Sequence, residues 1–322
     1  ESLKDELVKD LIDTGAEVTV PYLWTGNGSD NNWNTDENWA SGKFPDENTK
    51  IVYISKTNNQ PEISSGVDFS GGKIEIFDGA KLTIAEGGSL SIDANNITFG
   101  TGSSIVVDGT LNLKLTEDFT VGSNFAKESK GLISCTDSFD FIIDTDFEGL
   151  INFDCTKNVT LQNNKTVSFG TIKANTFTNK GTTTVNSNLS VGTVTNNGTL
   201  TINEDSEIKN FSNNGSAIVN DSKTLKITKK FNNEGTFSGK LKLSGSDLEQ
   251  DIQLAVGTNS VYETIEIDSS EKYISFTGNP KIKKLKVVSA KSVSFYHNPD
   301  CLISEIEDND SAIDYNFVYL SF

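Results

Sequence analysis

Apolar and polar residues alternate along short segments from about residue 50 onward, and Gly, Asn and Asp separate these segments. Alternation with a period of two is typical of a β-strand that buries one face. Strands are predicted at residues 73–76, 81–84, 89–92 and 110–113. No helical periodicity interrupts them, so the pattern predicts an all-β fold rather than a sheet built from β-α-β units.

An internal repeat follows in the middle of the chain. Its pattern is an apolar residue, a small polar residue, Asn, any residue, Gly, and then Thr or Ser. The copies FTNKGT, VTNNGT, FSNNGS and FNNEGT begin at Phe177, Val194, Phe211 and Phe231, and their glycines are 17, 17 and 20 residues apart. A near-constant spacing of this size indicates a solenoid in which one repeat forms one coil.

Equivalent residues of successive coils should stack, because parallel strands of neighbouring coils pair ~4.8 Å apart. Two buried columns are predicted, one of Val185, Ile202 and Val219 and one of Val194, Phe211 and Phe231. The Asn-x-Gly element is expected at the corners, where Gly tolerates a positive φ and Asn a left-handed conformation. Stacked Asn side chains can also form hydrogen bonds with one another along the stack.

The predicted fold is a right-handed parallel β-helix (solenoid) with a short N-terminal helix and a Trp-rich cap, since parallel crossovers are overwhelmingly right-handed. A pair of antiparallel sandwiches is the alternative, but sandwiches gain nothing from identical corners at one spacing. Residues 1–20 are expected to form a helix or linker and residues 21–54 a capping segment. Residues 55–322 are expected to form the β-helix, with irregular coils after Ser244.

Composition narrows the classes of function. The 322 residues include 27 Lys, no Arg, one His and 45 acidic residues, which give a net charge of −18. Such a chain is not expected to bind nucleic acid or anionic membranes, and no apolar run is long enough to insert into a bilayer. One His and no Arg leave little for His-rich metal sites, Ser-His-Asp chemistry or Arg–phosphate contacts. An acidic chain rich in Asn, Thr, Ser and Gly suits an exported bacterial protein, extracellular or on the cell surface.

Three cysteines, Cys135, Cys155 and Cys301, exclude a compact disulfide scaffold. Cys135 and Cys155 are 20 residues apart, about one coil. We expect two stacked, buried thiols there. A disulfide between coils and a reactive or metal-binding pair remain open.

Two candidate sites lie in the segment that holds all three tryptophans. Trp33 and Trp39 are candidate ligand-binding residues, because exposed rings stack on sugars or anchor a protein partner. Alternatively, they fill the mouth of the solenoid together with Trp24. Oxygen ligands for calcium are predicted at every second position of one loop, at Asp30, Asn32, Asn34 and Asp36.

The calcium pattern is incomplete, since Thr35 stands where an EF-hand needs Gly and Ser41 where it needs Glu. A solvated polar loop is therefore the alternative. Calcium is the one cofactor for which the sequence offers a site.

Acidic residues between 137 and 154 could carry polysaccharide cleavage, which uses carboxylates as acid and base. They lie on alternating segments such as residues 140–144, so most are expected to face solvent. His297 lies near a turn and is expected to be structural. We therefore predict no catalytic residues.

The segment around the tryptophans resembles a lead-in found in large bacterial surface and adhesin-like proteins. The resemblance rests on Trp24-Thr-Gly26, Trp33-Asn34, Asn38-Trp39 with Gly42, Pro45, and Ile51-Val-Tyr-Ile54. The Asn-Asn-Gly-Thr coils are similar to those of autotransporter passengers, although no membrane-anchoring domain is seen here. The resemblance speaks for the architecture more than for an activity, because a fold does not fix a function. We expect a non-enzymatic extracellular surface protein, an adhesin or structural rod, that binds a host matrix protein, a glycan or a neighbouring surface protein. A polysaccharide lyase or glycoside hydrolase, and a passive spacer without a ligand, are the alternatives.

Overall fold

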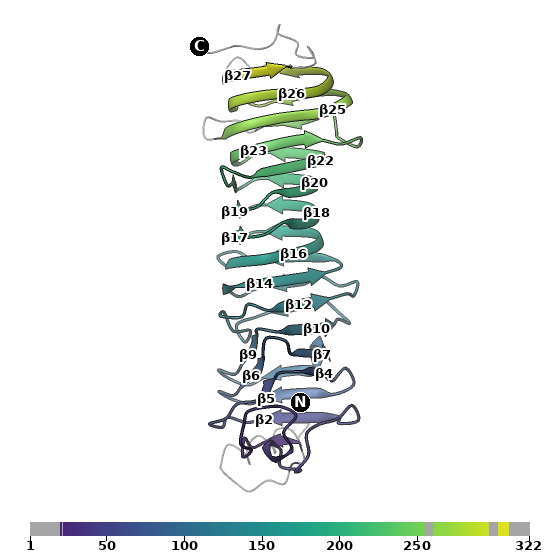
Figure 1. Ribbon diagram of the computed structural model, residues 1–322, viewed down its shortest axis with the longest axis vertical. Helices are drawn as coiled ribbons and strands as arrows, with labels where there is room; N and C mark the ends of the chain where they lie inside the picture. Colours follow the sequence, from purple (N-terminus) through teal and green to yellow (C-terminus); the bar gives the residue numbers. More distant parts are fainter. Residues whose placement is uncertain (1–19, 21, 255–259, 296–301, 309–322) are drawn as a thin grey trace. The chain divides into compact units, whose positions relative to one another are not determined.

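The computed structural model describes residues 20, 22–254, 260–295 and 302–308 and shows a parallel β-solenoid (Figure 1). The predicted all-β class is confirmed. The chain divides into two compact units, residues 1–154 and 155–322, and within each unit the strands lie one above another. The predicted N-terminal helix falls on residues outside the described part. In the described part, no helix is long and apolar enough to cross a bilayer.

Each coil of the first unit contributes strands to parallel sheets on different sides of the coil. The sheets follow the orders β1-β2-β5-β8 and β3-β6-β9, and a further series joins β4, β7, β10 and β12. The strands are β1 (Leu23–Trp24), β2 (Ile51–Ile54), β3 (Glu62–Ile63), β4 (Gly66–Asp68), β5 (Lys73–Ile76), β6 (Lys81–Ile84), β7 (Ser89–Asp93), β8 (Ile97–Phe99), β9 (Ser104–Val107), β10 (Thr110–Lys114), β11 (Phe119–Val121), β12 (Leu132–Cys135), β13 (Phe141–Ile143) and β14 (Phe147–Cys155). Two short 3-10 turns, η1 (Asp36–Asn38) and η2 (Ala94–Asn96), accompany them.

The core of the first unit is built from the alternation seen in the sequence. Leu90, Leu111 and Ile133 are register partners on β7, β10 and β12, and all three are fully buried. Their neighbours along each strand point outward and are partly exposed, which is what a strand with one buried face requires.

The second unit stacks the repeats. Its strands are β15 (Asn158–Leu161), β16 (Thr166–Asn179), β17 (Thr182–Val185), β18 (Leu189–Asn196), β19 (Thr199–Ile202), β20 (Ser206–Asn213), β21 (Ser216–Val219), β22 (Thr224–Asn233), β23 (Thr236–Ser244), β24 (Asp251–Gln253), β25 (Val261–Thr277), β26 (Lys281–Phe295) and β27 (Leu302–Asp308). Both predicted columns are confirmed as buried register partners: Val185, Ile202 and Val219, and Val194, Phe211 and Phe231.

The Asn of each repeat forms a buried hydrogen-bonded ladder. Side-chain Nδ2 of Asn179 donates to Oδ1 of Asn196 at 2.8 Å, Asn196 donates to Asn213 at 2.6 Å, and Asn213 donates to Asn233 at 2.6 Å. Asn233 then donates to the hydroxyl of Tyr262 at 2.8 Å. All four amides are fully buried. The stacking of Asn side chains expected from the sequence is therefore present, and this ladder lies inside the coil.

The corner glycines are required for a different reason from the one predicted. None of Gly181, Gly198, Gly215 and Gly235 has a positive φ, and the Asn residues of the repeat are not left-handed either. A Cβ at Gly198 would lie 2.0 Å from the carbonyl oxygen of Gly181, and each later corner glycine meets the glycine before it at the same distance. The backbones approach this closely because the next residue donates across the coils, as Thr199 N does to Gly181 O at 2.9 Å.

The last repeat is longer than the others, yet the register is kept. Ser206 pairs with Leu225 and Asn210 with Lys230, so the spacing changes at a bulge after Ile208. The remaining extra residues lie in the turn that joins β21 to β22. Irregular length is thus confined to one turn and one bulge, and the columns on either side stay aligned.

Candidate functional site

The three tryptophans form one compact cluster in the first unit. The ring of Trp39 lies edge-to-face with Trp24, at 5.2 Å between centroids, and with Trp33, at 4.8 Å. Trp39 Nε1 donates to the carbonyl of Trp33 at 2.8 Å, and Trp24 Nε1 donates to the carbonyl of Asn59 at 2.6 Å. The cluster continues the coil, since β1 pairs with β2 and Trp33 N donates to Glu62 O at 2.8 Å.

Burial limits what these rings can contact. Trp24 and Trp33 are 0% exposed and Trp39 is 2% exposed. The rings thus pack against one another and against Phe69, which lies 6.5 Å from Trp33. Ligand binding by Trp33 and Trp39 stays a prediction, and it would require the cluster to open.

The loop predicted to bind calcium is organised by its own hydrogen bonds. Asp30 accepts hydrogen bonds from the Asn32 backbone N–H and the Thr35 hydroxyl, both at 3.0 Å. These bonds, the Thr35 hydroxyl first, hold the pKa of Asp30 below its ordinary value. The Asn32 side chain accepts from Asn34 N at 2.9 Å, and Asp36 accepts from the Phe44 backbone N–H at 2.9 Å.

Each predicted calcium ligand therefore has a separate hydrogen-bond partner. Asn32 and Asn34 also donate through Nδ2 to Ser64 and Ser65, at 3.2 and 2.8 Å. No group of three or more His, Cys, Asp or Glu side chains suited to a metal occurs among the described residues. Calcium binding by Asp30, Asn32, Asn34 and Asp36 stays a prediction.

The acids that the enzyme alternative would use have structural partners. Asp137 Oδ2 accepts from the backbone N–H of Leu115 at 2.7 Å, across neighbouring coils. Glu148 pairs with Lys127 at 2.5 Å on an exposed part of the surface. His297 lies outside the described residues.

Cys135 and Cys155 are buried in β12 and β14, with 2% and 3% of their surfaces exposed. Both are disulfide-bonded and not free thiols. The expectation of two buried thiols was therefore wrong. Cys301 lies outside the residues described.

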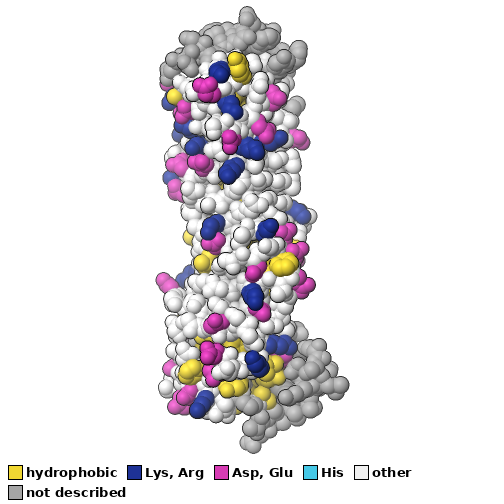
Figure 2. Space-filling view, turned by 90° about the vertical axis from the view of Figure 1, so that its right-hand side faces the viewer, with side chains coloured by type: hydrophobic (Ala, Val, Ile, Leu, Met, Phe, Trp, Pro, Cys, Tyr) yellow, Lys and Arg dark blue, Asp and Glu magenta, His cyan; other side chains and the backbone are white. Residues whose placement is uncertain are grey.

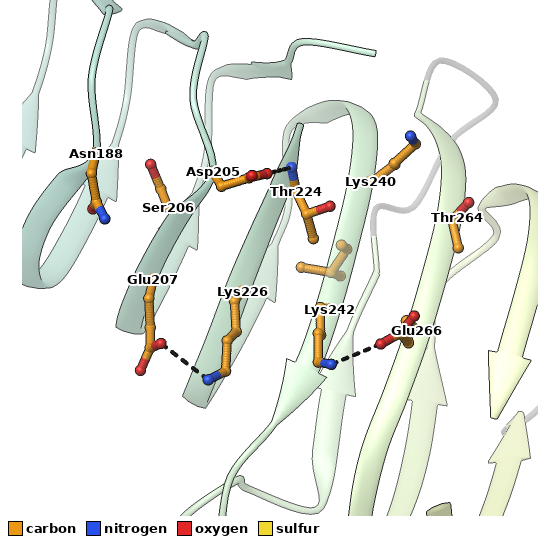
Figure 3. Close-up of a pocket in the computed structure, with 11 residues that line it drawn as sticks. Asn188, Asp205, Ser206, Glu207, Thr224, Lys226, Lys240, Lys242, Thr264 and Glu266 are labelled. Atoms are coloured by element: carbon orange, nitrogen blue, oxygen red, sulfur yellow. Dashed lines mark hydrogen bonds and ion pairs between the residues drawn. The ribbon is translucent and has the colours of Figure 1, made fainter. Parts of the chain in front are cut away.

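An open groove lies on the outer face of the second unit, over β20, β22, β23 and β25 (Figure 3). Its volume is about 460 Å³, within the range of about 300–1,000 Å³ that is usual for sites of small ligands. Its lining consists of Asn188, Asp205, Ser206, Glu207, Thr224, Lys226, Lys240, Leu241, Lys242, Thr264 and Glu266.

The pairing of the strands arranges this lining in two parallel rows. Thr224, Lys240 and Thr264 are register partners on β22, β23 and β25 and form the first row. The second row, two residues further along each strand, consists of Glu207, Lys226, Lys242 and Glu266. Residues two apart on a strand share a face, so both rows face the groove (Figure 3).

All four charges of the second row are paired. Lys226 Nζ lies 3.0 Å from Glu207 Oε2, and Lys242 Nζ lies 2.8 Å from Glu266 Oε1 and 3.2 Å from Asp268 Oδ2. Hydrogen bonds from Lys242 hold the pKa values of Glu266 and Asp268 below their ordinary range, and the bond to Glu266 raises the pKa of Lys242.

Lys240 differs from its neighbours. It is half-buried, and no carboxylate of the described residues forms an ion pair with it. The hydroxyls of Thr224 and Thr264 flank it on the adjacent strands. The first row thus offers one unpaired ammonium group between two hydroxyls.

Sequence reasoning missed this groove, although one signal was present. Residues 223–308 hold 12 Lys and 12 acidic residues, so the whole net charge of −18 lies outside that stretch. Lysine and acidic side chains lie side by side on the face seen in Figure 2. This local balance of charge distinguishes these coils from the rest of a strongly acidic chain, and it could have indicated a binding surface there.

No protein family, curated protein or solved structure matches the chain at a significant level.

Proposed function

We propose that the chain is a non-enzymatic binding scaffold on the outside of a bacterial cell, an adhesin or a structural surface protein. The observation that carries this proposal is the groove on the second unit. There, two rows of polar side chains are held at the regular spacing of paired strands, and one lysine is left without a carboxylate.

The interior of the same unit supports a scaffold role. A buried amide that makes all its hydrogen bonds fixes the register of its neighbours, because a slip would leave polar groups unsatisfied. The ladder from Asn179 to Asn233 joins β16, β18, β20 and β22, and the last two of these strands also carry residues of the groove. The outer rows are consequently pre-organised, which lowers the entropic cost of binding a ligand.

The location outside the cell is supported by the cysteines and the composition. Disulfides form and persist in oxidising compartments and are rare in the bacterial cytosol. Cys135 and Cys155 are both disulfide-bonded. The acidic, Asn- and Thr-rich sequence fits the same location.

A glycan and matrix-protein array tests the proposal on the intact chain. We expect at least one retained ligand and no chemical change in it. A variant with Asp140→Asn and Asp144→Asn should bind that ligand equally well, since neither residue belongs to the groove lining. Turnover that disappears in this variant would establish the enzyme alternative. An array that retains no ligand would establish the alternative of a passive spacer.

A further inference from the structure

We propose that the groove over β20, β22, β23 and β25 binds an acidic polysaccharide, a chain whose sugars carry carboxylates among free hydroxyl groups. This inference rests on the proposed binding function and names the class of ligand. It follows from three properties of the lining: the unpaired Lys240, the partly used carboxylates, and the repeat of the rows along the stack.

Lys240 supplies the recognition of a carboxylate. Its ammonium group has no ion-pair partner in the described part of the chain, whereas Lys226 has one and Lys242 has two. The hydroxyls of Thr224 and Thr264 make no hydrogen bonds of their own within that part. An ammonium group between two hydroxyl donors matches the two oxygens of a carboxylate.

The acidic residues of the groove supply acceptors for sugar hydroxyls. Asp205 uses Oδ1 to accept from the Thr224 backbone N–H at 2.8 Å, and Glu207 uses Oε2 to pair with Lys226. Each residue keeps its second carboxylate oxygen for a ligand. Ligand hydroxyls can donate to these oxygens, whereas a phosphate or sulfate ester in the place of a hydroxyl has no hydrogen to donate and would be repelled by them.

The ligand class follows by comparing these two requirements. A neutral sugar carries no negative charge that could pair with the ammonium group of Lys240. A polymer whose hydroxyls are esterified with sulfate or phosphate would bring anions in place of donors to Asp205 and Glu207 within the same groove. A sugar acid satisfies both, because it brings one carboxylate and several hydroxyl donors on each ring.

A polymer is favoured over a single sugar by the stacking. Each row runs across successive strands, which are ~4.8 Å apart, so a chain lying along a row meets an equivalent polar position on every coil. Such a chain can occupy the groove from Asn188 on one side to Thr264 on the other.

Isothermal titration calorimetry of the whole chain with a short oligogalacturonate tests the proposal. We expect binding that Lys240→Ala weakens by about tenfold or more, the effect of losing a charge-assisted hydrogen bond. Lys229→Ala is the matched control, since Lys229 lies on β22, is exposed and is not part of the groove lining. It removes the same charge and should change the affinity by less than about twofold.

Two further ligands separate specific recognition from general attraction. The methyl ester of the same oligosaccharide should bind much more weakly, because it keeps the hydroxyls and lacks the carboxylates. A sulfated dextran should also bind weakly, because its sulfate esters replace the hydroxyl donors that the second carboxylate oxygens of Asp205 and Glu207 would accept from.

The proposal is overturned if oligogalacturonate does not bind, if Lys229→Ala and Lys240→Ala weaken it equally, or if the ester binds as well as the acid. A different ligand on the array would then leave the scaffold function standing and remove only this ligand class. Failure of both experiments would remove both proposals.

Discussion

Asn213 Nδ2 donates to Asn233 Oδ1 at 2.6 Å, and both side chains are fully buried. The two residues lie 20 positions apart, in neighbouring coils. The same Nδ2 also donates to the carbonyl of Thr236 at 2.8 Å. The Asn213 amide thus joins two neighbouring coils through one side-chain acceptor and one backbone acceptor. Its removal should destabilise both coils.

Asn213→Ala should lower the free energy of unfolding of the second unit by about 2–5 kcal/mol. It removes the acceptor of one Asn196 Nδ2 hydrogen bond and the donor to both Asn233 Oδ1 and the Thr236 carbonyl, and each buried polar group left unsatisfied costs about 1–3 kcal/mol. Chemical unfolding measures the change. Asn214→Ala is the matched control, because Asn214 donates to Asn197 at 2.8 Å on the exposed surface. It should cost less than about 0.5 kcal/mol. Equal effects would contradict an internal role for the ladder.

Gly198→Ala should disrupt the coils around β17 and β19. The added Cβ would lie 2.0 Å from the carbonyl of Gly181, a backbone atom that cannot move without breaking the hydrogen bond from Thr199. Hydrogen exchange should show loss of protection in these strands. Gly122→Ala serves as the control, since nothing lies within 4 Å of its Cβ position. Normal protection in Gly198→Ala would refute the close-approach explanation.

Trp39→Ala should destabilise the first unit by about 3–5 kcal/mol, as is usual for removing a large buried aromatic side chain. It removes two edge-to-face contacts and the hydrogen bond to the Trp33 carbonyl. Thermal unfolding followed by tryptophan fluorescence measures the loss. Phe44→Ala, at a ring that is 41% exposed, should have little effect. If Trp39→Ala abolished ligand binding without changing stability, the ring would be a contact residue after all.

Cys135 and Cys155 should resist alkylation in the unfolded, unreduced chain and react fully after reduction. Both residues are disulfide-bonded, so neither has a free thiol that an alkylating reagent could modify. Mass spectrometry of peptides labelled before and after reduction reports each residue separately. Labelling of either residue before reduction would show that it is a free thiol, and the argument for an oxidising compartment would lose its support.

The stability of the second unit should decrease as the pH falls below about 4.5. Glu266 and Asp268 have pKa values lowered from 4.5 and 3.8 by hydrogen bonds from Lys242. A carboxylate with a lowered folded-state pKa stabilises the fold above its ordinary pKa and loses that contribution as the pH falls through the folded value.

Urea midpoints of the wild-type chain and of Glu266→Gln, measured from neutral to acidic pH, test this. The two proteins should differ at neutral pH and converge in acid, where Glu266 is protonated. A constant difference across the range would show that the Glu266 charge contributes nothing.

The coil architecture could be predicted from the sequence because the repeat keeps its register. Val185, Ile202 and Val219 are equivalent in sequence, and stacking makes them neighbours in space. The role of Gly198 could not be read correctly, because the requirement comes from a carbonyl of the coil before it and not from its own φ. Nor does the spacing of Trp24, Trp33 and Trp39 reveal that the rings face inward.

The groove escaped prediction for a similar reason. Its lining comes from strands whose sequence separation varies, since a bulge after Ile208 and a longer turn before Thr224 shift the spacing. Lys226 and Lys242 become neighbours only through the pairing of β22 with β23. Lys240 is unpaired because its register partners are both threonines, and this becomes visible only once the register is known.

The equal 17-residue separations of Asn179, Asn196 and Asn213 have an evolutionary consequence. After gene duplication or deletion of one whole coil, an Asn would still occupy the next position of the ladder. The protein could therefore lengthen or shorten by single coils without a compensating mutation. An insertion of any other length would have to fall in a turn or a bulge, as the extra residues of the last repeat do between β21 and β22 and after Ile208. Variation in length among descendants of this chain is thus expected in whole coils and at that turn.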